Sequence, residues 1–176
     1  MRERQILFSS NQIATKVSEL GKQIAQDYEN KNLLVIGLLK GSFVFVADLM
    51  RAIDKKIVIE FMTTSSYHDA EHSTGRVEIV QDLERDLTNF DVLIVDDIID
   101  SGLTMKSVYE LIKSRNPNSL KTCALLDKPS RRKVEFECDY VGFTIDDLFI
   151  VGYGLNYGDY YRNVDHIFIF LQEDEE

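Results

Sequence analysis

The sequence predicts an α/β fold, in which a mainly parallel, twisted sheet is flanked by helices. Short apolar runs alternate with segments of helical periodicity through the middle of the chain, and several of these runs are continuous. A continuous apolar run is typical of a strand buried on both faces, as in a parallel sheet covered by helices. The chain has 176 residues, 44% of them hydrophobic, which suits a single domain over residues 1–176.

Each element follows from the spacing of its apolar residues. The expected helices span about residues 11–29, 42–53 and 103–115. The expected strands span residues 33–38, 57–62, 77–80, 92–95, 120–126, 140–143, 150–151 and 167–171. Ser9, Ser10 or Asn11 would cap the first helix. Residues 63–75 are polar, small or turn-prone, and a loop of that length is typical of a functional segment.

Composition narrows the function. The net charge of −10 argues against a general nucleic-acid binder, because phosphate contacts need Lys and Arg. No run approaches the roughly 20 apolar residues of a membrane span, and the N-terminus lacks the longer apolar region of a signal peptide. We therefore expect a cytoplasmic protein with an acidic, solvated tail at residues 173–176. Cys123 and Cys138 lie in apolar runs, which indicates buried thiols rather than a disulfide framework.

An acidic pair ends the strand expected at residues 92–95. Asp96 and Asp97 follow that apolar run directly, and Asp100 comes three residues later. Ligands of α/β sheets bind at the carboxyl ends of the strands. Two neighbouring carboxylates can accept hydrogen bonds from the hydroxyls of a ribose, or coordinate Mg2+ together with substrate oxygens. Asp100 then remains as a candidate catalytic base.

The residues that follow the acidic pair have the properties of a phosphate cradle. Ser101, Gly102 and Thr104 provide two hydroxyls, small side chains and a glycine whose backbone can approach an anion. The helix expected to begin at residue 103 aims free N–H groups and the positive end of its dipole at the same place. The segment therefore predicts a site for a phosphorylated sugar.

Two common nucleotide-binding classes are excluded by their motifs. A nucleotide hydrolase would need G-x-x-x-x-G-K-[ST], and residues 37–42 have these residue types in the wrong order. A dinucleotide-binding fold would need G-x-G-x-x-G after an early strand, and that pattern is absent. A bland alternative is that the acidic pair is merely a solvated turn.

On the segment from residue 92 to residue 104, the chain resembles the type I phosphoribosyltransferases, and its further motifs resemble their hypoxanthine-guanine branch. The resemblance runs from about Val35 to Ile169. It implies that core residues of about 30–145 are covered by a small hood from the chain termini, about residues 1–12 and 146–176. It also implies that 5-phosphoribosyl 1-diphosphate (PRPP) is a substrate. The residues that would bind its ribose phosphate are Asp96, Asp97, Ser101, Gly102 and Thr104.

The resemblance gives further residues a role at the diphosphate and the metal. Lys40 and Gly41 would hold the diphosphate across a cis peptide between Leu39 and Lys40, and Arg162 would be a further contact. Mg2+ would bind at Asp96, Asp97 and Asn156. Asn156 departs from the family, which usually has Asp there, so the second metal site would lose a charge.

The base and the lid are also implied by the resemblance. Lys128 would bond the 6-oxo group of a purine, and a Lys only donates, which favours an oxo over an amino group. Phe149 would stack on the base, and Ile150 and Ile98 would contact it. Ser66 and Tyr67 would belong to a catalytic lid that excludes water. Arg131 and Arg132 are left open, either on an oligomer interface or in solvent.

The resulting hypothesis is an enzyme of purine salvage, a pentosyltransferase that converts hypoxanthine or guanine to IMP or GMP with Mg2+. The family also implies a homodimer or homotetramer, and neither nucleic acid nor membrane is an expected partner. One alternative is a xanthine-preferring or broad 6-oxopurine transferase. Others are an RNA-binding regulator of the pyrimidine-operon attenuator family, built on the same fold, and a catalytically silent binding module.

Overall fold

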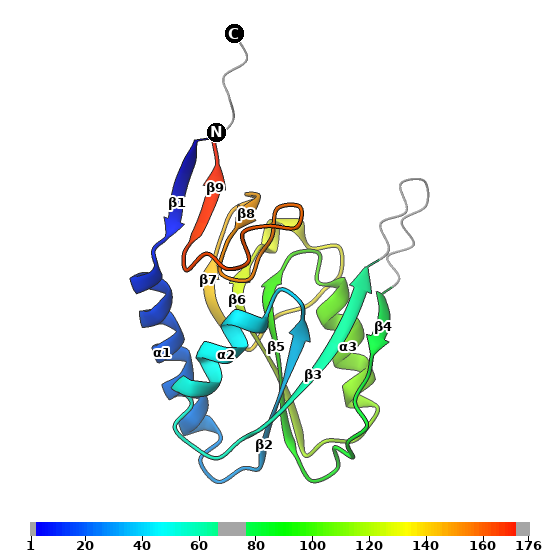
Figure 1. Ribbon diagram of the computed structural model, residues 1–176. Helices are drawn as coiled ribbons and strands as arrows, with labels where there is room; N and C mark the ends of the chain where they lie inside the picture. Colours follow the sequence, from blue (N-terminus) through cyan, green and yellow to red (C-terminus); the bar gives the residue numbers. More distant parts are fainter. Residues whose placement is uncertain (1–2, 67–76, 172–176) are drawn as a thin grey trace.

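The computed structural model describes residues 3–66 and 77–171, and a six-stranded sheet forms its centre (Figure 1). The strand order is β4-β3-β2-β5-β6-β7; only β4 runs antiparallel to its neighbour. The strands are β2 (Leu33–Leu39), β3 (Val58–Ser66), β4 (Val77–Gln81), β5 (Asp91–Ile99), β6 (Ser119–Asp127) and β7 (Tyr140–Thr144). The predicted α/β fold with a mainly parallel sheet is confirmed.

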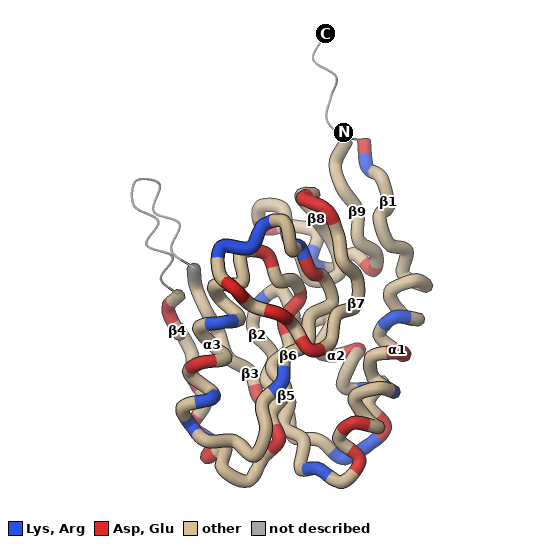
Figure 2. Tube along the Cα trace, turned by 180° about the vertical axis from the view of Figure 1, so that it is seen from behind, with Lys and Arg blue, Asp and Glu red and all other residues tan. Residues whose placement is uncertain are grey.

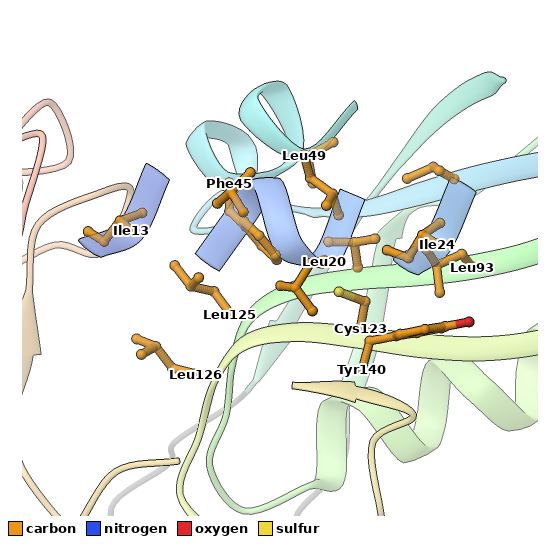
Figure 3. Close-up of a cluster of buried hydrophobic side chains, with 14 of the residues drawn as sticks. Ile13, Leu20, Ile24, Phe45, Leu49, Leu93, Cys123, Leu125, Leu126 and Tyr140 are labelled. Carbon is orange, nitrogen blue, oxygen red and sulfur yellow. The ribbon is translucent and has the colours of Figure 1, made fainter. Parts of the chain in front are cut away.

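Helices cover both faces of this sheet. The helices are α1 (Ser10–Asp27), α2 (Phe43–Ala52) and α3 (Leu103–Lys113), and a short 3-10 helix spans Pro129–Arg131. Side chains of α1 and α2 share one buried cluster, in which Ile24 lies beside Leu93 of β5 and to which Phe45 also belongs (Figure 3). Side chains of α3 pack in a second cluster against the opposite face.

The continuous apolar run of β2 is explained by these two clusters. Leu33 and Val35 lie in the cluster with α1 and α2, whereas Leu34, Ile36 and Leu38 lie in the cluster with α3. Successive side chains of a strand point to opposite faces, so a strand covered on both sides needs apolar residues at every position.

The start of α1 is fixed by a capping box. Ser9 Oγ accepts a hydrogen bond from the backbone N–H of Gln12 at 3.2 Å, and Gln12 Oε1 accepts one from the N–H of Ser9 at 2.8 Å. The two side chains satisfy backbone donors that have no partner inside the helix. Of the three predicted caps, Ser9 is the residue used.

A second, antiparallel sheet brings the two ends of the chain together as the predicted hood. Its order is β1-β9-β8, and Arg4 pairs with Phe170. The strands are β1 (Arg4–Phe8), β8 (Ile150–Val151) and β9 (Ile167–Phe170). The hood stands above the carboxyl ends of the central strands (Figure 1). β1 was not predicted, because its polar and apolar residues give no clear pattern before β9 pairs with it.

Two strands run further than predicted, and the predictions were wrong at those ends. β3 continues through residues 63–66, which were expected in a loop, because Thr64 pairs with Ile79 and Ser66 with Val77. β5 continues to Ile99 through the acidic pair, because its backbone stays in register with β6. Neighbouring strands thus override the polar side chains. Tyr67, the rest of the expected lid up to residue 75, and the tail at 173–176 lie outside the described residues.

Both cysteines are free, so no disulfide joins them. Cys123 is buried as predicted, whereas Cys138 is only half-buried, which corrects the expectation. Burial nevertheless raises the pKa of Cys138 to about 11, so its thiol stays protonated near neutral pH. Within the described part of the chain, no helix combines the length and apolar character needed to cross a membrane.

Candidate functional site

The predicted site residues divide between two places. One group lies at the carboxyl ends of β2, β3, β5 and β6, and the other lies on the hood above them (Figure 1). β5 is a central strand with β2 on one side and β6 on the other. Polar groups at its end are therefore flanked by the ends of two other strands, which is the usual place for a ligand in such a sheet.

The acidic pair lies near the carboxyl end of β5, on the side towards the hood. Asp97 is buried, with 8% of its surface exposed, and Asp96 is half-buried. Oδ1 of Asp96 accepts a hydrogen bond from the N–H of Asp97 at 2.9 Å, and Oδ1 of Asp97 accepts one from the N–H of Ile98 at 2.8 Å. These bonds fix the orientation of both carboxyl groups.

The electrostatics of the pair favour a positive ligand. Burial raises the pKa of Asp96 well above its ordinary value, and the charge of Asp97 adds to this effect. Burial also raises the pKa of Asp97, while hydrogen bonding and the charge of Arg162 act in the opposite direction. Two carboxyl groups that resist ionising together would be stabilised as a charged pair by a cation between them.

The predicted phosphate loop follows at the start of α3. Gly102 precedes the helix with φ of 81°, a left-handed conformation that favours glycine, and no side chain caps the helix. The N–H of Leu103 lies 3.3 Å from the hydroxyl oxygen of Ser101, and Thr104 is half-buried in the first turn. The first turn thus combines backbone N–H groups with two hydroxyls, as an anion site requires.

The loop after β2 meets both the acidic pair and the hood. The peptide between Leu39 and Lys40 is cis, as the resemblance implied, and Lys40 is exposed. A Cβ added to Gly41 would lie 1.9 Å from Oδ2 of Asp97, so the carboxylate rests against the backbone of this glycine. Only glycine allows this close approach.

The hood reaches the same point through Gly154 and Arg162. A Cβ added to Gly154 would lie 2.3 Å from the carbonyl oxygen of Gly41. Nη1 of Arg162 donates to the carbonyl oxygen of Gly154 at 2.6 Å, which holds the arginine next to the acidic pair. The structure thereby brings Arg162, Gly41 and Asp97 together. Gly154 was missed, although two glycines at 152 and 154 beside an apolar run were a usable signal.

Lys128 lies at the end of β6 and is buried, with 7% of its surface exposed. Its backbone N–H donates to the carbonyl oxygen of Ile99 at 2.9 Å, which attaches it to the end of β5. Across the described residues, its side-chain ammonium forms no hydrogen bond or ion pair. In the described part of the chain, the one buried side-chain polar atom without a hydrogen-bond partner is the hydroxyl of Tyr28, so the ammonium of Lys128 reaches solvent although most of the residue is buried. Its three donors are therefore available to a ligand that accepts hydrogen bonds.

Asp100 lies beside the phosphate loop and is about half exposed. Its Oδ1 is 3.4 Å from Nε of Arg131, whose Nη1 is also 3.4 Å from Asp147. These distances are long for charge-assisted hydrogen bonds. The carboxylate of Asp100 is therefore held loosely and remains accessible.

Three further predicted residues, Phe149, Ile150 and Asn156, lie on the hood. Phe149 is 63% exposed, and its ring meets that of Tyr157 edge-on with 5.8 Å between centroids. Ile150 is buried in β8. Asn156 is exposed, and its Nδ2 donates to the carbonyl oxygen of Gly158 at 2.6 Å, which leaves Oδ1 as the atom available to a ligand.

Arg132 is the residue that the sequence placed least well. It was expected on an oligomer interface or in solvent, yet only 17% of its side chain is exposed, and it bonds the backbone at the ends of β5 and β6. No spacing rule links an arginine after β6 to carbonyl groups after β5, so the sequence carried no signal for these contacts. Arg131, by contrast, is exposed.

Comparison with known proteins gives the same family throughout. A model of the phosphoribosyl transferase domain matches residues 4–158. A hypoxanthine-guanine phosphoribosyltransferase of Aquifex aeolicus is 44% identical over 169 residues, which are 96% of this chain and 95% of the relative. A Staphylococcus aureus protein of the same name is 47% identical over 164 residues, covering 93% of this chain and 92% of its own length.

Solved structures agree with these matches. A crystal structure of a hypoxanthine phosphoribosyltransferase from Staphylococcus aureus has a TM-score of 0.90 and 46% identity, covering 95% of this chain and 91% of its own. A hypoxanthine-guanine phosphoribosyltransferase from Bacillus anthracis, with a HEPES molecule in the active site, has a TM-score of 0.91 and 43% identity. It covers 97% of this chain and 100% of its own.

Proposed function

The chain belongs to the phosphoribosyl transferase family, and we propose that it acts in purine salvage as a hypoxanthine-guanine phosphoribosyltransferase. It transfers the 5-phosphoribosyl group of PRPP to N9 of hypoxanthine or guanine and releases diphosphate. The observation that carries this proposal is the end of β5, where the acidic pair Asp96 and Asp97, an uncapped helix start and the buried residue Lys128 meet.

The sugar phosphate fits the end of β5. The N–H groups at the start of α3, with Ser101 and Thr104, hold the 5-phosphate. The ribose hydroxyls donate to the carboxylates of Asp96 and Asp97. The diphosphate is held by Lys40, the backbone of Gly41 and Arg162. These groups suit that role because the backbone of Gly41 lies against the carboxylate of Asp97 and the charge of Arg162 acts on the same carboxylate.

The carboxyl groups at this site fit Mg2+. No cluster of three or more acidic, His or Cys residues suited to a metal exists in the described part of the chain. Mg2+ commonly uses one or two carboxylates and takes its other ligands from substrate oxygens and water. Asp96, Asp97 and Oδ1 of Asn156 would hold it, and when bound it would neutralise charge on the diphosphate.

The purine fits between the core and the hood. The ammonium of Lys128 donates to the 6-oxo group, and the exposed ring of Phe149 stacks on the base. Ile98 and Ile150 supply apolar contact and backbone groups at the base edge. The 6-amino group of adenine donates hydrogen bonds, as the ammonium of Lys128 does, so the two groups cannot bond each other through these donors. Adenine is therefore a poor substrate.

Asp100 acts as the general base. N9 of the purine bonds to C1 of the ribose while the bond from C1 to the diphosphate oxygen breaks, through an oxocarbenium-like transition state. The proton on N7 passes to the carboxylate of Asp100. The loose pairing with Arg131 leaves that carboxylate free to take it.

The two other functional classes are less well supported. An RNA-binding regulator needs a basic face, whereas the net charge is −10 and Figure 2 shows basic residues interspersed with acidic ones. A xanthine-preferring or broad 6-oxopurine enzyme would use the same site, and the names of the relatives do not favour it.

The test is direct incubation with PRPP, Mg2+ and each of hypoxanthine, guanine, xanthine and adenine. We expect IMP and GMP with stoichiometric diphosphate, and little product from adenine. Retention of RNA on a filter at moderate salt, without nucleotide formation, would instead support the regulator. No PRPP-dependent product from any base would refute the enzymatic proposal.

Three expectations remain predictions. The lid predicted at Ser66 and Tyr67 is proposed to exclude water from the reacting centre, with Ser66, the last residue of β3, as its fixed end. Two or four identical subunits are proposed for the assembly, which light scattering would measure. The cytoplasmic location would be measured by cell fractionation.

A further inference from the structure

Arg132 is surrounded by backbone carbonyl groups from three segments. Its Nη1 donates to the carbonyl oxygens of Asp100 at 2.8 Å, Ile99 at 3.1 Å and Lys128 at 3.4 Å. Its Nε donates to that of Phe136 at 3.2 Å. Because one guanidinium bonds all of these carbonyl groups, it fixes the positions of the segments that contain them relative to one another.

A half-buried ion pair holds the guanidinium in place. Nη2 of Arg132 contacts Oδ1 of Asp127, and their side chains are only 17% and 16% exposed. The stem of Arg132 also lies under Gly102, because a Cβ added to that glycine would be 3.2 Å from Cδ of the arginine. Arg132 therefore touches the phosphate loop from below as well as through hydrogen bonds.

The two segments that Arg132 joins have different tasks in the proposed reaction. Residues 99–102 hold the sugar phosphate, and Lys128 contacts the base. Two backbone hydrogen bonds run in parallel with the arginine, from the N–H of Lys128 to Ile99 and from the N–H of Lys133 to Ser101, each at 2.9 Å. The transfer reaction requires the base and the sugar to be held at a fixed separation.

We propose that Arg132 is a positioning residue that couples the phosphate loop at residues 99–102 to the purine contact Lys128. This inference rests on the proposed function. Arg132 does not touch either substrate; it sets the distance between the two places where they bind. Loss of its hydrogen bonds should therefore weaken the binding of both substrates. Loss of a residue that contacts one substrate should weaken the binding of that substrate alone.

A guanidinium is needed for this role. Its five donors form a planar fork, and here all three nitrogens are used on four carbonyls and one carboxylate. The ammonium of a lysine presents its donors from one point and cannot reach all of these carbonyl groups and the carboxylate at once. Arg132→Lys therefore keeps the charge for Asp127 but releases part of the backbone.

The test compares Arg132→Lys with Arg115→Lys. Arg115 also pairs with an aspartate and bonds a carbonyl oxygen, but at Asp82 and Leu83, away from the site. In Arg132→Lys we expect the Kd of PRPP and the KM of hypoxanthine each to rise on the order of tenfold, since small misplacements of bound groups have large effects. Arg115→Lys should change neither constant, even if it lowers Tm.

Hydrogen exchange supplies a readout that does not depend on activity. The backbone amides of Lys128 and Lys133 should exchange faster in Arg132→Lys than in the wild type. In Arg115→Lys, the exchange rates of these two amides should equal those of the wild type. If the wild type makes no nucleotide while these amides respond, the proposed function fails and the structural coupling stands. If both constants and both amides are unchanged in Arg132→Lys, the coupling is refuted. If Arg132→Lys does not fold, Asp127→Asn takes its place in the same test. We expect smaller changes in the Kd of PRPP, in the KM of hypoxanthine and in the exchange rates of the two amides.

Discussion

The two halves of the candidate site differ in how firmly their side chains are held. At the ends of the central strands, Asp97 and Lys128 are 8% and 7% exposed, and the backbone N–H of each donates a hydrogen bond, to Oδ1 of Asp96 and to the carbonyl oxygen of Ile99 respectively. On the hood, Phe149 and Tyr157 are 63% and 42% exposed. The core half is preorganised, whereas the hood half presents aromatic surface that a ligand would cover.

This difference matches two kinds of recognition. A charged sugar diphosphate gains most from fixed charges and N–H groups, because these need no rearrangement when the substrate arrives. A flat base gains from stacking on an exposed ring, which depends less on orientation. Variants in the core half should therefore have larger effects than variants in the hood half.

The largest effect is expected for Asp100→Asn. Removal of the proposed base should lower kcat by about 10²- to 10⁴-fold, with a modest change in PRPP affinity. Steady-state kinetics and calorimetry with Mg2+ and PRPP measure the two quantities. Asp147→Asn, which changes the other carboxylate paired with Arg131, is the control and should leave kcat nearly unchanged. Wild-type turnover in Asp100→Asn would exclude the assignment of the base.

Gly41→Ala is expected to be next. The new methyl group would lie 1.9 Å from Oδ2 of Asp97, so the carboxylate must move, and PRPP affinity should fall by about 10²-fold. Gly21→Ala is a matched control, because its methyl group would meet Ala52 at 2.5 Å, far from the site. Gly21→Ala should lower Tm without lowering the affinity for PRPP. Equal PRPP affinity in both variants would contradict the close contact between Gly41 and Asp97.

Phe149→Leu tests the hood half. Loss of the ring should raise the KM of hypoxanthine by about tenfold, the size expected for a lost stacking contact, and leave PRPP affinity alone. Phe61→Leu removes another exposed ring, on β3, and should change neither value. A PRPP defect as large as the defect for the base would show that the two halves are not separable in this way.

The smallest effect is expected for Asn156→Asp. A carboxylate in place of the amide adds a charge at the proposed metal site, so Mg2+ with PRPP should bind about fivefold more tightly. Calorimetry over a range of Mg2+ concentrations measures this. Asn163→Asp adds the same charge at an exposed position nearby and serves as the control. An equal gain in both variants would point to net charge rather than to a metal ligand.

The sequence predicted most of the fold, since every expected helix and strand is present in the described residues. Apolar periodicity reports burial, and burial decides where elements lie. The pattern failed where pairing between distant strands decides: β1 depends on β9, and the polar ends of β3 and β5 depend on β4 and β6.

For the site, the sequence indicated the residues that carry charge or motif but not those that act through the backbone. Gly154 matters because of its contact with Gly41, and Arg132 because of carbonyl groups on other segments. A carbonyl group exists at every residue, so its use as an acceptor leaves no trace in the sequence. Such contacts become visible only in three dimensions.

The pairing of β1 with β9 also has a consequence for how the protein is made. Arg4 leaves the ribosome long before its partner Phe170 is synthesised. The hood therefore cannot assemble until nearly the whole described chain has been synthesised, by which time the central sheet can already have folded. During synthesis, the central sheet should thus fold first and the hood afterwards.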